Sequence, residues 1–188
     1  ERNKIRSLQV LGSCTKLQLV NCDGNEITSI LPLKNSKGLE VITCRNNNID
    51  NLSYLQDLDH LKYLDIGDNR VSSIDFVTSL DSIEILSFHQ NRVSKLPEFN
   101  KDQIIRELWC SHNDIEDFSS LSNLKRLTTL SCSFNSKPLN IENVISIAKL
   151  NNLEFLYFFN NRTSTPRLEL LLDSVNDFNK LENNCVFE

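Results

Sequence analysis

The sequence is notable first for what it has little of: it contains no methionine, four glycines, four prolines and one tryptophan. Few glycines and prolines exclude collagen-like and linker-like chains. No run of eighteen apolar residues is present, so no transmembrane helix is expected. Methionine is missing even at position 1, and no apolar signal-peptide core follows the first residues. We therefore expect a processed or excised piece of a longer protein.

Positive charge is also scarce. The chain has 20 lysines and arginines against 25 aspartates and glutamates, a net charge of −5. Nucleic-acid binding normally needs a basic stripe that displaces counterions, so neither a nucleic-acid partner nor a structural role in a ribonucleoprotein particle is expected. At 188 residues, 39% of them hydrophobic, the chain is long enough for one well-buried domain.

An internal repeat organises nearly the whole sequence. An asparagine recurs every 22 residues, and the last one follows after 26, at Asn3, Asn25, Asn47, Asn69, Asn91, Asn113, Asn135 and Asn161. Apolar residues, cysteine included, align eight, five and three positions before each asparagine from Asn25 onward. Apolar residues also stand two positions after each asparagine up to Asn113, whereas Lys137 and Thr163 follow the last two. Several aligned columns at a fixed period predict a solenoid of stacked coils.

The columns predict how each coil is built. Alternating apolar positions before the asparagine indicate a short strand. The asparagine is expected to turn inward, where its amide bonds backbone groups that the bend leaves unpaired. Seven strands spaced about 4.8 Å apart would give a parallel concave sheet roughly 30 Å long. Apolar residues after the asparagine bring the chain back along an irregular convex side.

Two segments carry a family resemblance. LKYLDIGDNRV at 61–71 and IEILSFHQNRV at 83–93 resemble the LxxLxLxxNxI core of leucine-rich repeats. The 22-residue spacing is similar to the subclass found in the regulatory subunit of protein phosphatase 1, spindle-pole scaffolds and bacterial internalins. The resemblance covers about residues 1 to 163. It implies an α/β solenoid: a right-handed superhelix with a parallel concave sheet, a 3-10 or irregular convex side and a C-terminal capping helix.

The two ends of the array depart from the pattern. We expect residues 1–163 to form a partial first repeat plus seven repeats, with an insertion near 137–150 that reads as a short helix capped by Asn140. Residues 164–188 are expected to form a C-terminal cap helix and tail, with Thr165 as N-cap and Pro166 at the first helical position. That cap helix does not match the signatures of the ribonucleoprotein and phosphatase-regulator members.

The cysteines point to a reducing compartment. Cys22, Cys44, Cys110 and Cys132 occupy an inward column otherwise filled by large apolar residues, so we interpret them as small core hydrophobes. Side chains on neighbouring coils would run parallel, which is poor disulfide geometry. A glycosylation sequon at Asn161 would also modify an asparagine expected to be buried. We therefore expect an intracellular protein, cytoplasmic or associated with the cytoskeleton.

The candidate binding site lies on the outward positions of the strands, six, four and two residues before each asparagine. The single tryptophan falls there, together with an aromatic triple on the last strand, and exposed aromatics are frequent interface anchors. The alternative is that the triple packs under the C-terminal helix or under the 140–150 excursion, and that the tryptophan is core. The candidates are Tyr63, Asp65, Ile85, His89, Glu107, Trp109, His112, Phe134, Phe155, Tyr157 and Phe159.

No catalytic motif accompanies this surface. No glycine-rich phosphate loop, nucleophile elbow or HExxH helix is present, and carboxylates on an open sheet are poorly placed for acid–base chemistry. His89 and His112 fall on adjacent coils without an evident third ligand, so no metal or cofactor is expected. We predict a monomeric, non-catalytic adaptor that binds a protein or peptide segment in signalling, cytoskeletal or cell-division assemblies. The alternative is an internalin-like bacterial surface or effector protein that recognises a host protein.

Overall fold

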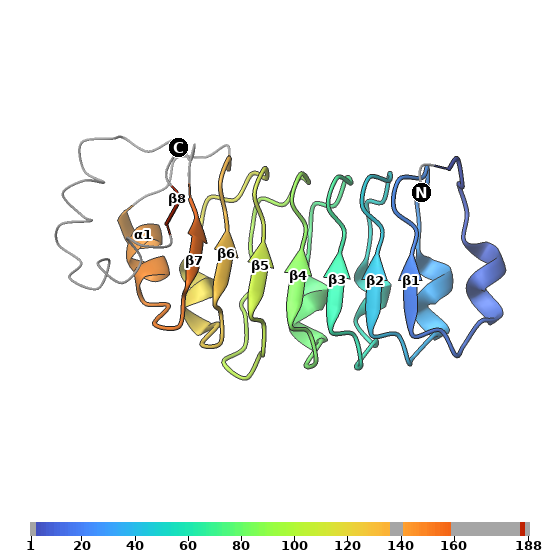
Figure 1. Cartoon of the computed structure of the whole chain (residues 1–188), viewed down its shortest axis with the longest axis horizontal. Coiled ribbons are helices and arrows are strands. Elements are labelled where there is room, and N and C mark those ends of the chain that lie inside the picture. Colours follow the sequence, from blue (N-terminus) through green and yellow to red (C-terminus); the bar gives the residue numbers. More distant parts are fainter. Residues whose placement is uncertain (1–2, 136–140, 159–184, 187–188) are drawn as a thin grey trace.

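The structure, a computed structural model, describes residues 3–135, 141–158 and 185–186. Short strands stack in chain order into one parallel sheet along an elongated molecule (Figure 1). The strands are β1 (Leu19–Asn21), β2 (Val41–Thr43), β3 (Tyr63–Asp65), β4 (Ile85–Ser87), β5 (Glu107–Trp109), β6 (Thr129–Ser131), β7 (Phe155–Tyr157) and β8 (Cys185–Val186).

The register of the sheet follows the sequence period. Each residue of β1 to β5 pairs with the residue 22 positions later, as in Leu64 with Leu86, and β6 pairs with β7 at the expected spacing of 26, as in Leu130 with Leu156. The prediction of seven strands falls one short, because Cys185–Val186 adds β8 in parallel to β7. The predicted cap helix beginning at Pro166 lies outside the described residues.

The ladder asparagines turn inward, as predicted. The Asn69 amide donates to the carbonyls of Cys44, Ile66 and Gly67 at 2.9 to 3.1 Å, while its oxygen accepts from the Ile49 N–H at 2.9 Å. The same four-bond pattern recurs at Asn47, Asn91 and Asn113. One side chain therefore joins two consecutive coils. It supplies the acceptor for the Ile49 N–H, and it shares each of the three carbonyls with a second donor, from Asn47, Asn91 and the Asn46 N–H.

The convex side carries short helical segments on the side of the sheet away from the viewer in Figure 1. Five are 3-10 helices: η1 (Gln9–Ser13), η2 (Leu31–Asn35), η3 (Ser53–Leu55), η4 (Asp75–Ser79) and η5 (Ser119–Asn123). The predicted excursion forms α1 (Ile141–Ala148), while its proposed cap, Asn140, lies outside the described residues. Asn143 anchors α1 to the previous coil by accepting from the Phe118 N–H and donating to the Glu116 carbonyl, at 2.9 and 2.8 Å.

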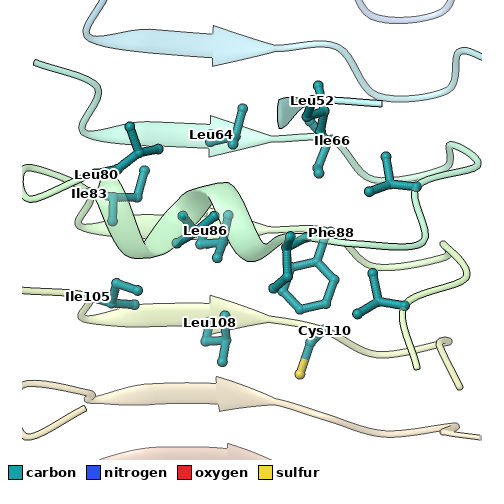
Figure 2. Close-up of a cluster of buried hydrophobic side chains, with 14 of the residues drawn as sticks. Leu52, Leu64, Ile66, Leu80, Ile83, Leu86, Phe88, Ile105, Leu108 and Cys110 are labelled. Carbon is teal, nitrogen blue, oxygen red and sulfur yellow. The ribbon is translucent and has the colours of Figure 1, made fainter. Parts of the chain in front are cut away.

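One continuous apolar core fills the space between the sheet and the convex side (Figure 2). Leu64, Leu86 and Leu108 extend inward from successive strands and are fully buried. Phe88 fills a position that a cysteine occupies in the next coil, at Cys110. Because every coil covers its neighbours, stability is distributed along the array as nearest-neighbour contacts.

The column cysteines are core residues, as predicted: Cys22, Cys44, Cys110 and Cys132 are buried and free. Burial raises the pKa of Cys110 and of Cys132, because desolvation disfavours the thiolate. Both thiols are therefore protonated and unreactive at neutral pH.

Left-handed backbone recurs at one position of the coil. Immediately before the ladder asparagines, Gly24, Asn46, Asp68, Gln90, His112 and Phe134 all have φ between 51° and 66°. This conformation turns the chain out of the strand so that the following asparagine can enter the interior, and these side chains lie at the rim of the sheet. Among the described residues, no helix is both long and apolar enough to cross a membrane.

Candidate functional site: the concave face

The concave face is defined here as the outward side of the strands together with the rim residues that follow them. In the strands, alternation places the central residue in the core and its two neighbours outside. The outward positions form rows that run across the sheet. The middle row consists of Asn21, Thr43, Asp65, Ser87, Trp109, Ser131 and Tyr157.

Trp109 and Tyr157 form an aromatic platform on this row. Their rings stack with centroids 5.8 Å apart and planes inclined by 29°, although their strands are separated by β6. Between them in the row lies Ser131, whose small side chain is buried and whose hydroxyl lies 2.7 Å from that of Ser111. The serine leaves room for the two rings to meet above it. Trp109 is thus half-buried on the concave face rather than in the core.

Glu107 lies beside the indole. Trp109 Nε1 donates to Glu107 Oε2 at 3.1 Å, which links two outward positions of the same strand. The row neighbours of Glu107 are Ile85 and Thr129, both uncharged. Among the described residues no cation forms an ion pair with Glu107. The platform therefore carries a negative charge at its edge.

The two candidate histidines have different surroundings. His112 stacks on Phe134 of the next coil, with centroids 4.4 Å apart and planes within 9°. His89 instead bonds the Ser87 hydroxyl through Nδ1 at 3.0 Å and covers Gly67, where an added Cβ would lie 2.1 Å from its Cε1. The two rings therefore make different contacts, and the described residues contain no group of three or more histidine, cysteine or acidic side chains placed to hold a metal ion.

The expectation that Asp65 faces solvent is wrong. It lies on the concave side, but only 4% of it is exposed. Its carboxylate accepts from the Gly67 N–H at 3.0 Å and pairs with Arg45 Nε at 3.4 Å. Short side chains in a row sink below the level of longer neighbours, which explains the burial of Ser87, Ser131 and Ser133 as well. Asp65 supports Arg45 rather than forming a contact surface.

The remaining candidates are placed along the same face. Tyr63 and Ile85 are half-buried neighbours in the first row. Burial, and secondarily the nearby Asp65 carboxylate, raises the pKa of the Tyr63 hydroxyl. Phe155 and Phe134 are large apolar side chains that remain 43% and 37% exposed. Phe159 lies outside the described residues. The exposed aromatic surface is thus concentrated on the coils that contain β5, β6 and β7.

A row of opposite charges borders the concave face where the chain enters the strands. Lys62 Nζ lies 2.8 Å from Glu40 Oε2, and Arg106 pairs with Glu84. The hydrogen bond and charge of Lys62 lower the pKa of Glu40, and Glu40 in turn raises the pKa of Lys62. Sequence reasoning missed this border, although the alternation of Glu40, Lys62, Glu84 and Arg106 at 22-residue spacing is legible in the sequence.

The sequence matches the family described as Leucine Rich repeats (2 copies) over residues 37–79 and 105–146. Together with the parallel sheet and the inward asparagines, this match decides the repeat type. The chain has the leucine-rich-repeat fold. No curated protein sequence matches it significantly, so the remaining comparisons of this leucine-rich-repeat protein are with solved structures.

Several solved leucine-rich-repeat structures share the fold. A protein of Leptospira interrogans aligns with TM-score 0.80 and 22% identity, covering 100% of this chain and 53% of its own. Internalin C2 of Listeria monocytogenes aligns with TM-score 0.65 and 19% identity, covering 84% and 77%. The plant peptide hormone receptor RGFR1, solved in complex with RGF2, aligns with TM-score 0.69 and 22% identity, covering 82% and 26%. The chain thus spans about half of the Leptospira protein and a quarter of the receptor.

Proposed function

We propose that this leucine-rich-repeat protein is a non-catalytic scaffold that binds a protein or peptide segment on its concave face. The observation that carries the proposal is the Trp109–Tyr157 platform, which holds two large aromatic rings at the surface, 5.8 Å apart. Tryptophan and tyrosine are the residues most enriched among interface hot spots. Because the two rings lie outside the core, they offer surface for a partner and are not part of the repeated packing that stabilises the coils.

The fold supports the same proposal in a second way. The outward rows change from coil to coil while the interior columns repeat, as expected where partner choice is encoded on a common scaffold. The receptor RGFR1 was solved in complex with RGF2, which illustrates ligand binding by a protein with this fold. We further propose an intracellular adaptor role in signalling, cytoskeletal or cell-division assemblies, which the free, buried cysteines favour. The internalin-like alternative, recognition of a host protein, would use the same face.

The test is peptide selection against the whole chain. Random peptides displayed on phage are selected on the wild-type protein, and the dissociation constants of the selected peptides are then measured for variants. Trp109→Ala should weaken binding by roughly 2 kcal/mol or more, as for a hot spot, while leaving the melting temperature nearly unchanged. Tyr157→Ala should weaken it in the same direction.

The matched control is Val10→Ala, because Val10 is 82% exposed and lies on η1, away from the concave face. This variant should bind the selected peptides as the wild type does. If Trp109→Ala lowers the melting temperature strongly and leaves binding unaltered, the tryptophan is structural and the proposal fails.

A further inference from the structure

The Trp109 platform has one feature that an apolar anchor site does not need, which is the carboxylate of Glu107 held against the indole edge. We propose that Glu107, Trp109 and Tyr157 form a receptor for an arginine side chain of the bound partner. This inference rests on the proposed function and deepens it, because it names the chemistry that the concave face selects.

The charge balance of the face carries the first step. Two acidic side chains on the preceding coils have cationic partners: Asp65 pairs with Arg45 at 3.4 Å, and Glu84 pairs with Arg106. Glu107 has no such ion pair among the described residues. A partner that brings a cation to this point neutralises a charge that the described part of the chain leaves uncompensated.

The geometry of the rings carries the second step. Tyr157 stacks on Trp109 across Ser131, so the opposite face of the indole is directed towards β4. There the register partner of Trp109 is Ser87, a small buried residue. Indole is the best aromatic partner for a cation placed over its face. A cation placed over this face of Trp109 would also lie near the Glu107 carboxylate, which accepts from the ring Nε1 at 3.1 Å.

The shape of the site favours arginine over lysine. A guanidinium is planar, so it can stack on the indole while its N–H groups donate to the carboxylate, and it is less strongly hydrated than an ammonium. Glu107 Oε2 already accepts from Trp109 Nε1, which orients the carboxylate relative to the ring. The segment that fits is an extended chain crossing the strands and presenting an arginine at the level of β5.

The protein contains its own probe for this site, because Trp109 is the single tryptophan of the chain. Its fluorescence is titrated with N-acetyl-arginine amide, N-acetyl-lysine amide and N-acetyl-citrulline amide at constant ionic strength. Citrulline keeps nearly the shape of arginine and removes its charge. We expect a saturable change with arginine, at an affinity about fivefold or more above that for citrulline, as for one cation–π contact with one charge-assisted hydrogen bond. Lysine should fall between the two.

The deciding variant is Glu107→Gln, which keeps an oxygen acceptor for the indole N–H but removes the charge. It should lower the affinity for the arginine probe about fivefold or more, with an unchanged melting temperature. Glu154→Gln is the matched control, since Glu154 is an exposed carboxylate that lies just before β7, and it should leave the affinity unchanged. Tyr157→Leu should weaken binding as well.

Several outcomes would overturn the inference. Equal responses to arginine and citrulline, equal affinities for arginine and lysine, or equal effects of Glu107→Gln and Glu154→Gln would each show that the site does not select a guanidinium. If one of these results is obtained but the selected peptides still lose affinity in Trp109→Ala, the proposed scaffold function stands and only the arginine site is refuted. Selected peptides that are indifferent to Trp109→Ala would instead remove the proposed function.

Discussion

The inward side of the strands repeats from coil to coil, whereas the outward side varies. The central, inward positions hold one aliphatic residue in every coil, in the series Val20, Ile42, Leu64, Leu86, Leu108, Leu130 and Leu156. The adjacent outward row runs from Asn21 through Asp65 to Trp109 and Tyr157, with almost no repetition. The inward side and the asparagine ladder hold the coils together, while the outward side is free to vary and can encode a partner.

The largest expected effect comes from the inward side. Asn113→Leu removes the donor to the carbonyls of Phe88, Cys110 and Ser111 and the acceptor for the Val93 N–H. The Val93 N–H then lies in the interior without a partner, while the three carbonyls each lose one donor and keep a second, from Asn91, Asn135 and the Gln90 N–H. Because four hydrogen bonds are lost at one point of the interior, we expect a loss of about 3 kcal/mol or more in the free energy of unfolding, measured by urea denaturation.

The matched control for this change is Asn123→Leu on the convex side. Asn123 is only half-buried, and its amide donates to one carbonyl, that of Phe99. It should cost about 1 kcal/mol, the usual net worth of one hydrogen bond. Equal losses for the two asparagines would contradict the special role of the ladder.

A smaller loss of stability is expected from Gly67→Ala on the outward side, where the His89 ring covers the glycine. In Gly67→Ala the new Cβ would meet the His89 ring, whose Cε1 lies 2.1 Å from that position. The ring can swing away, so the cost in stability should be about 1 kcal/mol or less, the value of the lost bond to Ser87. The imidazole resonances of His89 should shift in NMR spectra.

Gly38→Ala serves as the comparison for Gly67→Ala, because a Cβ at Gly38 meets only the Leu17 carbonyl at an ordinary 3.8 Å. This variant should leave the His89 resonances where they are in the wild type. If both alanine variants give the same spectrum, His89 does not rest on Gly67.

The smallest effect concerns the charged border. Lys62 lowers the pKa of Glu40 below its ordinary value of 4.5, so the folded state binds the Glu40 proton less readily than the unfolded state. The stabilisation by this pair is therefore fully present above that ordinary value and is lost as the pH falls through the lowered pKa. Because both side chains are exposed, the effect should be small and screened by salt.

The measurement is the difference in melting temperature between wild type and Glu40→Gln. A small difference is expected at pH 7 and low salt, and it should shrink as the pH falls below 4.5 and when the salt is raised to 1 M. A double variant with Lys62→Gln should lose no more than either single variant, since both remove the same pair. A difference that persists in acid would assign the effect to something other than the ion pair.

The period of the sequence was sufficient to predict the register of the sheet. Once the asparagines are 22 residues apart, the inward columns, the concave rows and the side of the sheet to which Trp109 belongs follow from alternation along a strand. The stacking of Trp109 on Tyr157 could also have been found, because a serine between two aromatics in one row leaves a space that rings can bridge. That signal lies in the rows, which are read across coils rather than along the chain.

Other features depend on side-chain reach, which the repeat does not specify. Asp65 is buried because Arg45 lies against it and because its own carboxylate turns back to the Gly67 N–H. His89 covers Gly67 because that position lacks a side chain of its own. The eighth strand, Cys185–Val186, lies after the last ladder asparagine, in a segment without the repeat pattern, so no column could align it with β7.

The coils differ in backbone strain at the left-handed position before each ladder asparagine, because different residue types occupy it. The first three examples are Gly24, Asn46 and Asp68, the residue types that accept this conformation most readily. The last is Phe134, a bulky residue for which it is uncommon. Steric strain is thus tolerated at the end of the array where the aromatic platform and the His112–Phe134 stack lie, and a glycine there would relax the backbone while removing the ring. The surrounding coil therefore holds a bulky residue in a conformation that most side chains avoid.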